Sequence, residues 1–209
     1  MAPPLKVFGF NCSLKNSKAG ESSSTDALMK QVFDALAEYG ASGDIVRAAD
    51  YDIKPGVTDD EGGGDAWPEL RKRVLAADIL VIGLPIWLGQ PSSVAKRVLE
   101  RMDAFLDLKD DKGRMPSYGK VAICAIVGNE DGAHHTGAEV LSALFEVGFT
   151  IPAGGNTYWV GEAMGSKEYK EFKKPPEAVA KWNAMLASNT VHLARLLKAE
   201  QYPGIAGGR

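Results

Sequence analysis

The apolar run DILVIGL at residues 78–84 constrains the fold most strongly. It is long enough for a strand but too short for a helix of its own. A strand with one face exposed to solvent has a polar residue at every second position. After its leading aspartate, this run has no such alternation. A strand of this kind is buried on both faces, which is typical of the centre of a parallel sheet. We therefore expect helices on both sides of a central sheet.

Further strand and helix patterns alternate on either side of this run. Strands are expected from residue 7 onward, at 44–48, at 120–127, and in an interrupted form at 149–152 and 157–160. Amphipathic helices are predicted at residues 26–39, 67–77, 94–105, 137–147 and 176–199. We expect Gly40 and Gly43 to close the first helix and Asp65 to cap the second. Strands that alternate with helices predict a doubly wound α/β fold with a five-stranded parallel sheet.

The composition predicts one globular domain. The chain has 209 residues, 45% hydrophobic and 24% charged, without an abrupt change that would mark a boundary. We expect a single domain over residues 1–209, with 1–4 and 203–209 frayed. The longest apolar run, at 76–87, is too short to cross a bilayer, and the N-terminus lacks the pattern of a secretory signal. A cytoplasmic protein is therefore expected.

Charge and cysteine usage narrow the classes of partner. The net charge is −3 with acids and bases mixed throughout, so the sequence gives no electrostatic footprint for nucleic acid or for a membrane surface. Cys12 and Cys124 both fall in apolar strand patterns, and we expect them to be free buried thiols. Because no second pair of ligands accompanies them, no metal site is expected.

Three loops have unusual compositions and follow the first, third and fourth predicted strands, at residues 13–25, 85–93 and 128–135. In doubly wound sheets the ligand binds beyond the carboxyl ends of the strands, near the point where the strand order reverses. We therefore expect the three loops to meet at one site.

Loop one, residues 13–25, has the chemistry of a phosphate site. Hydroxyl groups lie just after the first strand and just before the first helix, where the helix N-terminus favours an anion, at Ser13, Ser23, Ser24 and Thr25. The alternative interpretation is that the last three are ordinary helix caps. The loop matches neither the glycine pattern of a dinucleotide fold nor that of a nucleoside triphosphatase.

Loops two and three suit a flat ring. In loop two, residues 85–93, Trp87 and Leu88 offer stacking area at a strand end, although Trp87 could instead pack on a helix or a partner subunit. In loop three, residues 128–135, small residues expose backbone N–H groups that could stabilise an electron-rich ring, and a solvated turn is the alternative. His134 or His135 could move protons near neutral pH, and His135 is expected at the surface.

The order and spacing of the three loops resemble those of the flavodoxin-like NAD(P)H-dependent FMN reductases and quinone reductases, over residues 6–197. The resemblance implies a flavodoxin-like sheet. It places the FMN phosphate against Ser13, Lys15, Ser23, Ser24 and Thr25. It places the isoalloxazine ring on Pro85, Ile86, Trp87, Leu88 and Gly89. The other side of the ring would face Asn129, Glu130, Asp131 and Gly132.

The same resemblance implies an activity. A hydride would pass from NADH or NADPH to FMN and then to a quinone, a free flavin or a similar small acceptor, with His134 as a candidate proton donor or polar contact. Family members commonly form homodimers, so a homodimer or higher homo-oligomer is expected. Here seven residues, 16–22, separate Lys15 from the hydroxyl cluster, where the family often has an arginine and a shorter segment. Residues 157–174 are a candidate cover for the flavin.

Two other classes of function fit the same fold. A flavodoxin-type electron carrier would bind FMN but exchange electrons with a protein, and the modest net charge argues against the single-sign docking surface of such a carrier. A non-catalytic flavin-binding or regulatory protein could also use this fold, because a fold alone does not determine function.

Overall fold

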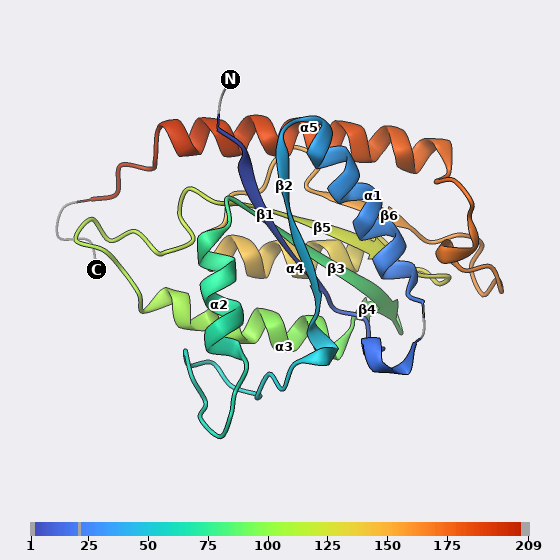
Figure 1. Cartoon of the computed structure of the whole chain (residues 1–209), viewed down its shortest axis with the longest axis horizontal. Coiled ribbons are helices and arrows are strands. Elements are labelled where there is room, and N and C mark those ends of the chain that lie inside the picture. Colours follow the sequence, from blue (N-terminus) through green and yellow to red (C-terminus); the bar gives the residue numbers. More distant parts are fainter. Residues whose placement is uncertain (1–2, 21, 206–209) are drawn as a thin grey trace.

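The computed structural model describes residues 3–20 and 22–205, and it contains the expected parallel sheet (Figure 1). Its five parallel strands lie in the order β2-β1-β3-β5-β6, which is the flavodoxin-like order. They are β1 (Leu5–Asn11), β2 (Ala41–Arg47), β3 (Ile79–Trp87), β5 (Val121–Val127) and β6 (Asn156–Trp159). A two-residue strand, β4 (Gln90–Pro91), pairs antiparallel with the end of β3. The predicted five-stranded parallel sheet is confirmed.

Helices cover both faces of the sheet, as Figure 1 shows. One buried cluster joins the sheet to α1 (Ser24–Glu38) and α5 (Glu177–Ala199). The other joins it to α2 (Trp67–Ala76), α3 (Ser93–Arg101) and α4 (Ala133–Glu146). Short 3₁₀ turns connect these elements: η1 (Ser17–Ala19), η2 (Ala48–Asp50), η3 (Met102–Leu106) and η4 (Tyr169–Glu171). The doubly wound arrangement is therefore confirmed.

The side chains of β3 explain its long apolar run. Ile79 and Val81 belong to the cluster under α1 and α5, whereas Leu80, Ile82 and Leu84 belong to the cluster on the opposite face. Successive strand side chains point to opposite faces, so covering both faces requires apolar residues at both alternate sets of positions. The strand also continues to Trp87, so residues 85–87 lie in β3 rather than in the predicted loop.

Several predicted helix boundaries differ from those in the structure. Gly40 closes α1 with φ +81°, but Gly43 lies inside β2, where the backbone oxygen of Val7 on β1 approaches too closely for any side chain. Helix α4 begins at Ala133 rather than 137, because Gly132, with φ +117°, ends the preceding loop. Position 66 is the N-cap of α2, although the Asp65 carboxylate still accepts a bond from the Trp67 N–H at 3.1 Å.

Residues 203–205, which belong to the C-terminal stretch expected to fray, contact the rest of the chain. The Ile205 N–H donates to the Lys112 carbonyl at 2.9 Å, so residues 203–205 pack against the 110–114 turn. Residues 1–2 and 206–209, also predicted to fray, lie outside the described residues.

Both cysteines are free and buried as expected, and burial raises the pKa of Cys124 to about 12. Over residues 3–20 and 22–205, no helix is both long and apolar enough to cross a membrane.

A tight hairpin joins β3 to β4 and packs on the start of α4. Leu88 and Gly89 form its tip with φ +54° and +72°, and two positive φ values are typical of the type I′ turns of two-residue hairpins. The Leu88 N–H donates to the Glu130 carboxylate at 2.9 Å. A Cβ on Gly132 would lie 2.7 Å from the Gly89 Cα. Only a glycine at 132 lets the hairpin and α4 approach this closely.

We predict that Gly132→Ala lowers the free energy of unfolding by ~2–4 kcal/mol, because it combines a strained φ with a backbone clash. Gly62→Ala is the control, since Gly62 also has positive φ (+71°) but, apart from its two chain neighbours, no described residue has a heavy atom within 4 Å of the point that its Cβ would occupy. Its expected cost is only ~1–2 kcal/mol. Urea unfolding followed by circular dichroism measures both, and equal costs would show that the hairpin contact contributes nothing.

Candidate functional site

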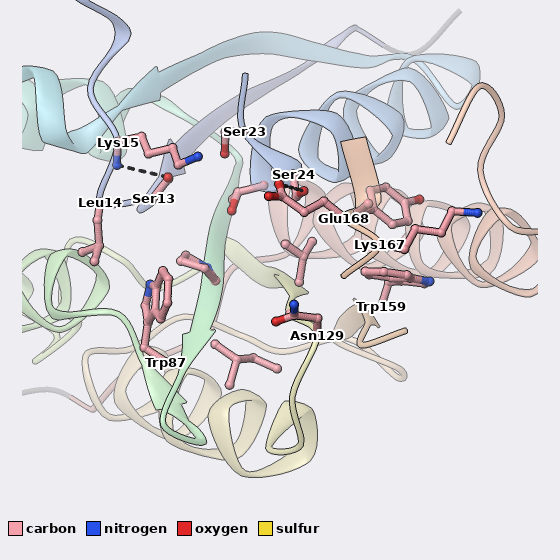
Figure 2. A pocket seen from close by; sticks show the side chains of 16 residues that line it. Ser13, Leu14, Lys15, Ser23, Ser24, Trp87, Asn129, Trp159, Lys167 and Glu168 are labelled. Atoms are coloured by element: carbon pink, nitrogen blue, oxygen red, sulfur yellow. Dashed lines mark hydrogen bonds between the residues drawn. The ribbon is translucent and has the colours of Figure 1, made fainter. Parts of the chain in front are cut away.

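A pocket of about 300 Å³ lies at the carboxyl ends of β1, β3 and β5, where the topology places the site (Figure 2). The three predicted loops all contribute to it. Of the predicted site residues, the pocket is lined by Ser13, Lys15, Ser23, Ser24, Thr25, Pro85, Ile86, Trp87 and Asn129. Its remaining lining residues are Leu14, Val127, Gly128, Trp159, Lys167, Glu168 and Tyr169.

The hydroxyl groups gather at the N-terminus of α1. Ser13 comes directly after β1, and Ser23, Ser24 and Thr25 lie at the start of the helix. Ser23 is the N-cap, and its hydroxyl oxygen accepts from the Asp26 N–H at 3.4 Å. A hydroxyl oxygen that accepts a bond still carries a proton to donate. Capping by Ser23 is therefore compatible with a phosphate at this helix end.

A partly buried chain of polar contacts fixes the position of Ser13. The side-chain oxygen of Asn11 accepts from the Ser13 N–H at 2.8 Å, and the Asn11 amide nitrogen donates to Asp26. Asp26 also forms an ion pair with Arg47 at the end of β2. The end of β1 and the first turn of α1 are thus bonded to each other.

The middle of loop one has a second attachment. The Ser17 N–H and hydroxyl both donate to the Asp50 carboxylate, at 2.6 and 2.7 Å. The bond from the Ser17 backbone N–H has the larger effect on the pKa of Asp50, and together with the hydroxyl bond it holds that pKa below its usual value. The sequence patterns did not indicate a role for Asn11, Asp26, Arg47 or Asp50. An asparagine at the end of an apolar strand was the one available signal.

The other end of the pocket is apolar. Pro85, Ile86 and Trp87 form one wall, and the Trp87 side chain is 52% exposed, which leaves its indole available for stacking. Val127 and Gly128, at the end of β5, form the adjacent wall. A Cβ on Gly128 would lie 3.0 Å from Ile86, so the glycine allows the ends of β3 and β5 to come together.

Six predicted site residues do not line this pocket: Leu88, Gly89, Glu130, Asp131, Gly132 and His134. The first five belong to the contact between the hairpin tip and loop three. His134 lies in the first turn of α4, where its Nε2 is 3.1 Å from the Tyr158 hydroxyl. His135 is exposed as expected, 2.7 Å from the Glu139 carboxylate.

Four residues of the 157–174 segment line the pocket: Trp159, Lys167, Glu168 and Tyr169. That this segment covers a flavin stays a prediction. Trp159, Tyr169 and Phe172 pack together with ring centroids 5.4–5.8 Å apart. The Tyr169 hydroxyl donates to Gln31 on α1, and burial raises the pKa of Tyr169 to about 12. Loop three is attached as well, because the Asn129 amide donates to the Gly165 carbonyl at 2.8 Å.

Glu168 extends from this segment toward the hydroxyl end, as Figure 2 shows. Its carboxylate accepts a long bond of 3.5 Å from the Ser24 hydroxyl and forms an ion pair of 2.8 Å with Lys170. The bond from Lys170 holds the pKa of Glu168 below its usual value, and the positive charge of Lys15 acts in the same direction. Glu168 is therefore ionised at neutral pH.

Residues 5–165 match the family described as NADPH-dependent FMN reductase, and the chain belongs to that family. Membership, with the flavodoxin-like fold, supports an FMN-binding flavin oxidoreductase. The chain is 33% identical to 8-demethyl-8-aminoriboflavin-5'-phosphate synthase of Streptomyces davaonensis, over 95% of this chain and 80% of that protein.

Solved structures agree with this assignment. The crystal structure of RosB with bound 8-demethyl-8-formylriboflavin-5'-phosphate matches with a TM-score of 0.86 and 33% identity, over 95% of this chain and 82% of that one. The apo form of the NADH:FMN oxidoreductase EmoB matches with a TM-score of 0.62 over 98% of this chain and 97% of that one. At 17% identity, this second likeness shows the fold alone.

One further relative is much longer than this chain. The chain is 38% identical to the divalent metal cation transporter MntH of Mycobacterium bovis, over 95% of this chain, and it spans about 30% of the length of that protein.

We predict that Asp26→Ala lowers the free energy of unfolding by ~1–3 kcal/mol, because Asn11 and Arg47 each lose a charge-assisted partner. Asp34→Ala is the matched control on the same helix, since Asp34 pairs with the exposed Lys30. Its expected cost is below ~0.5 kcal/mol. Urea unfolding measures both, and equal costs would argue against a structural role for the Asn11–Asp26–Arg47 chain.

Proposed function

We propose that the protein is an FMN-dependent oxidoreductase that takes a hydride from NADH or NADPH and passes electrons to a quinone, a free flavin or a similar small acceptor. The observation that carries this proposal is that one pocket joins a hydroxyl-lined helix N-terminus to the apolar wall of β3. A phosphate monoester attached to a flat ring has this same division into a charged end and an apolar end.

The residues of the chain would divide the work of holding FMN. The hydroxyls of Ser13, Ser23, Ser24 and Thr25 would donate to the phosphate, with the helix dipole behind them. Pro85, Ile86 and Trp87 would support one face of the ring and exclude water from it, and Asn129 would lie along another side. When bound, FMN supplies the hydride chemistry itself, so the protein needs no side-chain nucleophile.

The remaining expected residues would act around the pocket. Glu130 and Gly132 would hold the hairpin that carries Trp87, together with Leu88, Gly89 and Asp131. We propose His134, with Tyr158, as a polar contact for the co-substrate or acceptor rather than for the flavin. We also propose a cytoplasmic homodimer or higher homo-oligomer, in which Leu88 and Met164, each 90% exposed, would be covered.

A second candidate function treats the flavin as substrate. The relative named as an aminoriboflavin phosphate synthase, and the structure with a formylriboflavin phosphate bound, are both 33% identical to this chain. An enzyme that modifies riboflavin 5'-phosphate at the ring would need the same phosphate end and the same apolar wall. It would differ in releasing a changed flavin.

We predict that the protein mixed with FMN oxidises NADH or NADPH when a quinone is added, because bound flavin accepts the hydride and the quinone reoxidises it. Loss of absorbance at 340 nm measures this, with free FMN lacking protein as the control. If neither nucleotide is oxidised, the proposed activity is wrong. Mass spectrometry of the recovered flavin then tests the second candidate, which requires a changed mass.

We predict that Ser24→Ala combined with Thr25→Ala weakens FMN binding by ~2–4 kcal/mol, about thirty- to a thousandfold, because two hydrogen bonds to a charged group are lost. Riboflavin lacks the phosphate and serves as the control ligand, with little expected change. Quenching of flavin fluorescence gives both affinities. Unchanged FMN affinity would place the phosphate elsewhere.

A further inference from the structure

Glu168 places a carboxylate in the part of the pocket where the proposed ligand carries its phosphate. It lines the same pocket as Ser24, Thr25 and Lys15, and its side chain lies next to Ser24 in Figure 2. Its side chain is 46% exposed and is ionised, as its ion pair with Lys170 requires. A second anion cannot share this position without strong repulsion between like charges.

Glu168 and a phosphate would both need the single hydroxyl proton of Ser24. Its hydroxyl oxygen accepts from the Lys170 N–H at 3.2 Å, and its proton is directed to Glu168 at 3.5 Å. A serine hydroxyl has one proton to donate. Ser24 can therefore donate to Glu168 or to a phosphate, but not to both.

We propose that Glu168 competes with the flavin phosphate for the Ser24 hydroxyl and for the positive charges of Lys170 and Lys15. The flavin is then an exchangeable ligand, whose arrival displaces the carboxylate and whose departure is assisted by its return. This inference rests on the proposed function, since it takes the phosphate to bind at the start of α1.

The structure allows this displacement without unfolding the segment. The backbone around Glu168 is held by contacts that do not involve its carboxylate: the packing of Trp159, Tyr169 and Phe172, and the bond from Tyr169 to Gln31. The half-exposed side chain needs only to rotate toward solvent. The long Ser24 bond is a weak one to give up.

The decisive experiment compares Glu168→Gln with Glu171→Gln. Glutamine keeps a carbonyl oxygen that can accept from Ser24 but removes the charge, so it isolates the repulsion. Glu171 is an exposed glutamate three residues further along the same segment and controls for the change in net charge. Affinities for FMN and for riboflavin are measured by fluorescence quenching, and FMN dissociation by stopped flow.

We expect Glu168→Gln to tighten FMN binding about five- to twentyfold and to slow FMN dissociation. Riboflavin affinity should stay within about twofold, and Glu171→Gln should change neither ligand by more than that. Glu168→Ala, which removes the acceptor as well, should also tighten FMN and keeps the test valid if the glutamine variant fails to fold.

Two results would overturn the inference. Unchanged or weaker FMN binding in Glu168→Gln shows no competition, and equal weakening of FMN and riboflavin shows that Glu168 bonds the sugar-like chain that both ligands carry. The proposed function fails in a different way, namely if the wild-type protein binds neither flavin or binds FMN no more tightly than riboflavin.

Discussion

The chain of bonds from Arg47 through Asp26 and Asn11 to the Ser13 N–H is the constraint on which the site depends. It joins the ends of two neighbouring strands to the first turn of α1. Without these bonds, the Ser13 hydroxyl would have no fixed position relative to the hydroxyls at the start of α1. Asp26 at this turn also adds a negative charge near the proposed phosphate site, and the Arg47 ion pair offsets it.

Much of the fold could be predicted because local patterns determine it. The run at 78–84 and the hydroxyl cluster at 23–25 are each readable within a few residues, and both lie where expected. The limits of β3 were less readable, because Pro85, Ile86 and Trp87 look like a loop until β4 supplies a partner for their last residues. Pairing of this kind depends on a turn, and a sequence pattern shows it poorly.

The individual contacts of the segment after β6 could not be predicted, although the segment itself was expected near the site. Glu168 and Ser24 are 144 residues apart in the sequence, and Tyr169 and Gln31 are 138 apart. Such contacts follow from the packing of complete elements rather than from any local preference. The six predicted site residues that do not line the pocket also reflect long-range packing. Their loops come together as expected, but these six residues lie at the hairpin tip and the start of α4.

The short path between Gly165 and Lys170 has a mechanical consequence. The Gly165 carbonyl is bonded to Asn129 at the apolar end of the pocket, and the Lys170 backbone N–H donates to the Ser24 hydroxyl at the opposite end. Only four residues separate Gly165 from Lys170, so the chain between these two bonds cannot extend far. A backbone shift at either end therefore pulls directly on the other, so that the two halves of the pocket adjust together rather than as independent walls.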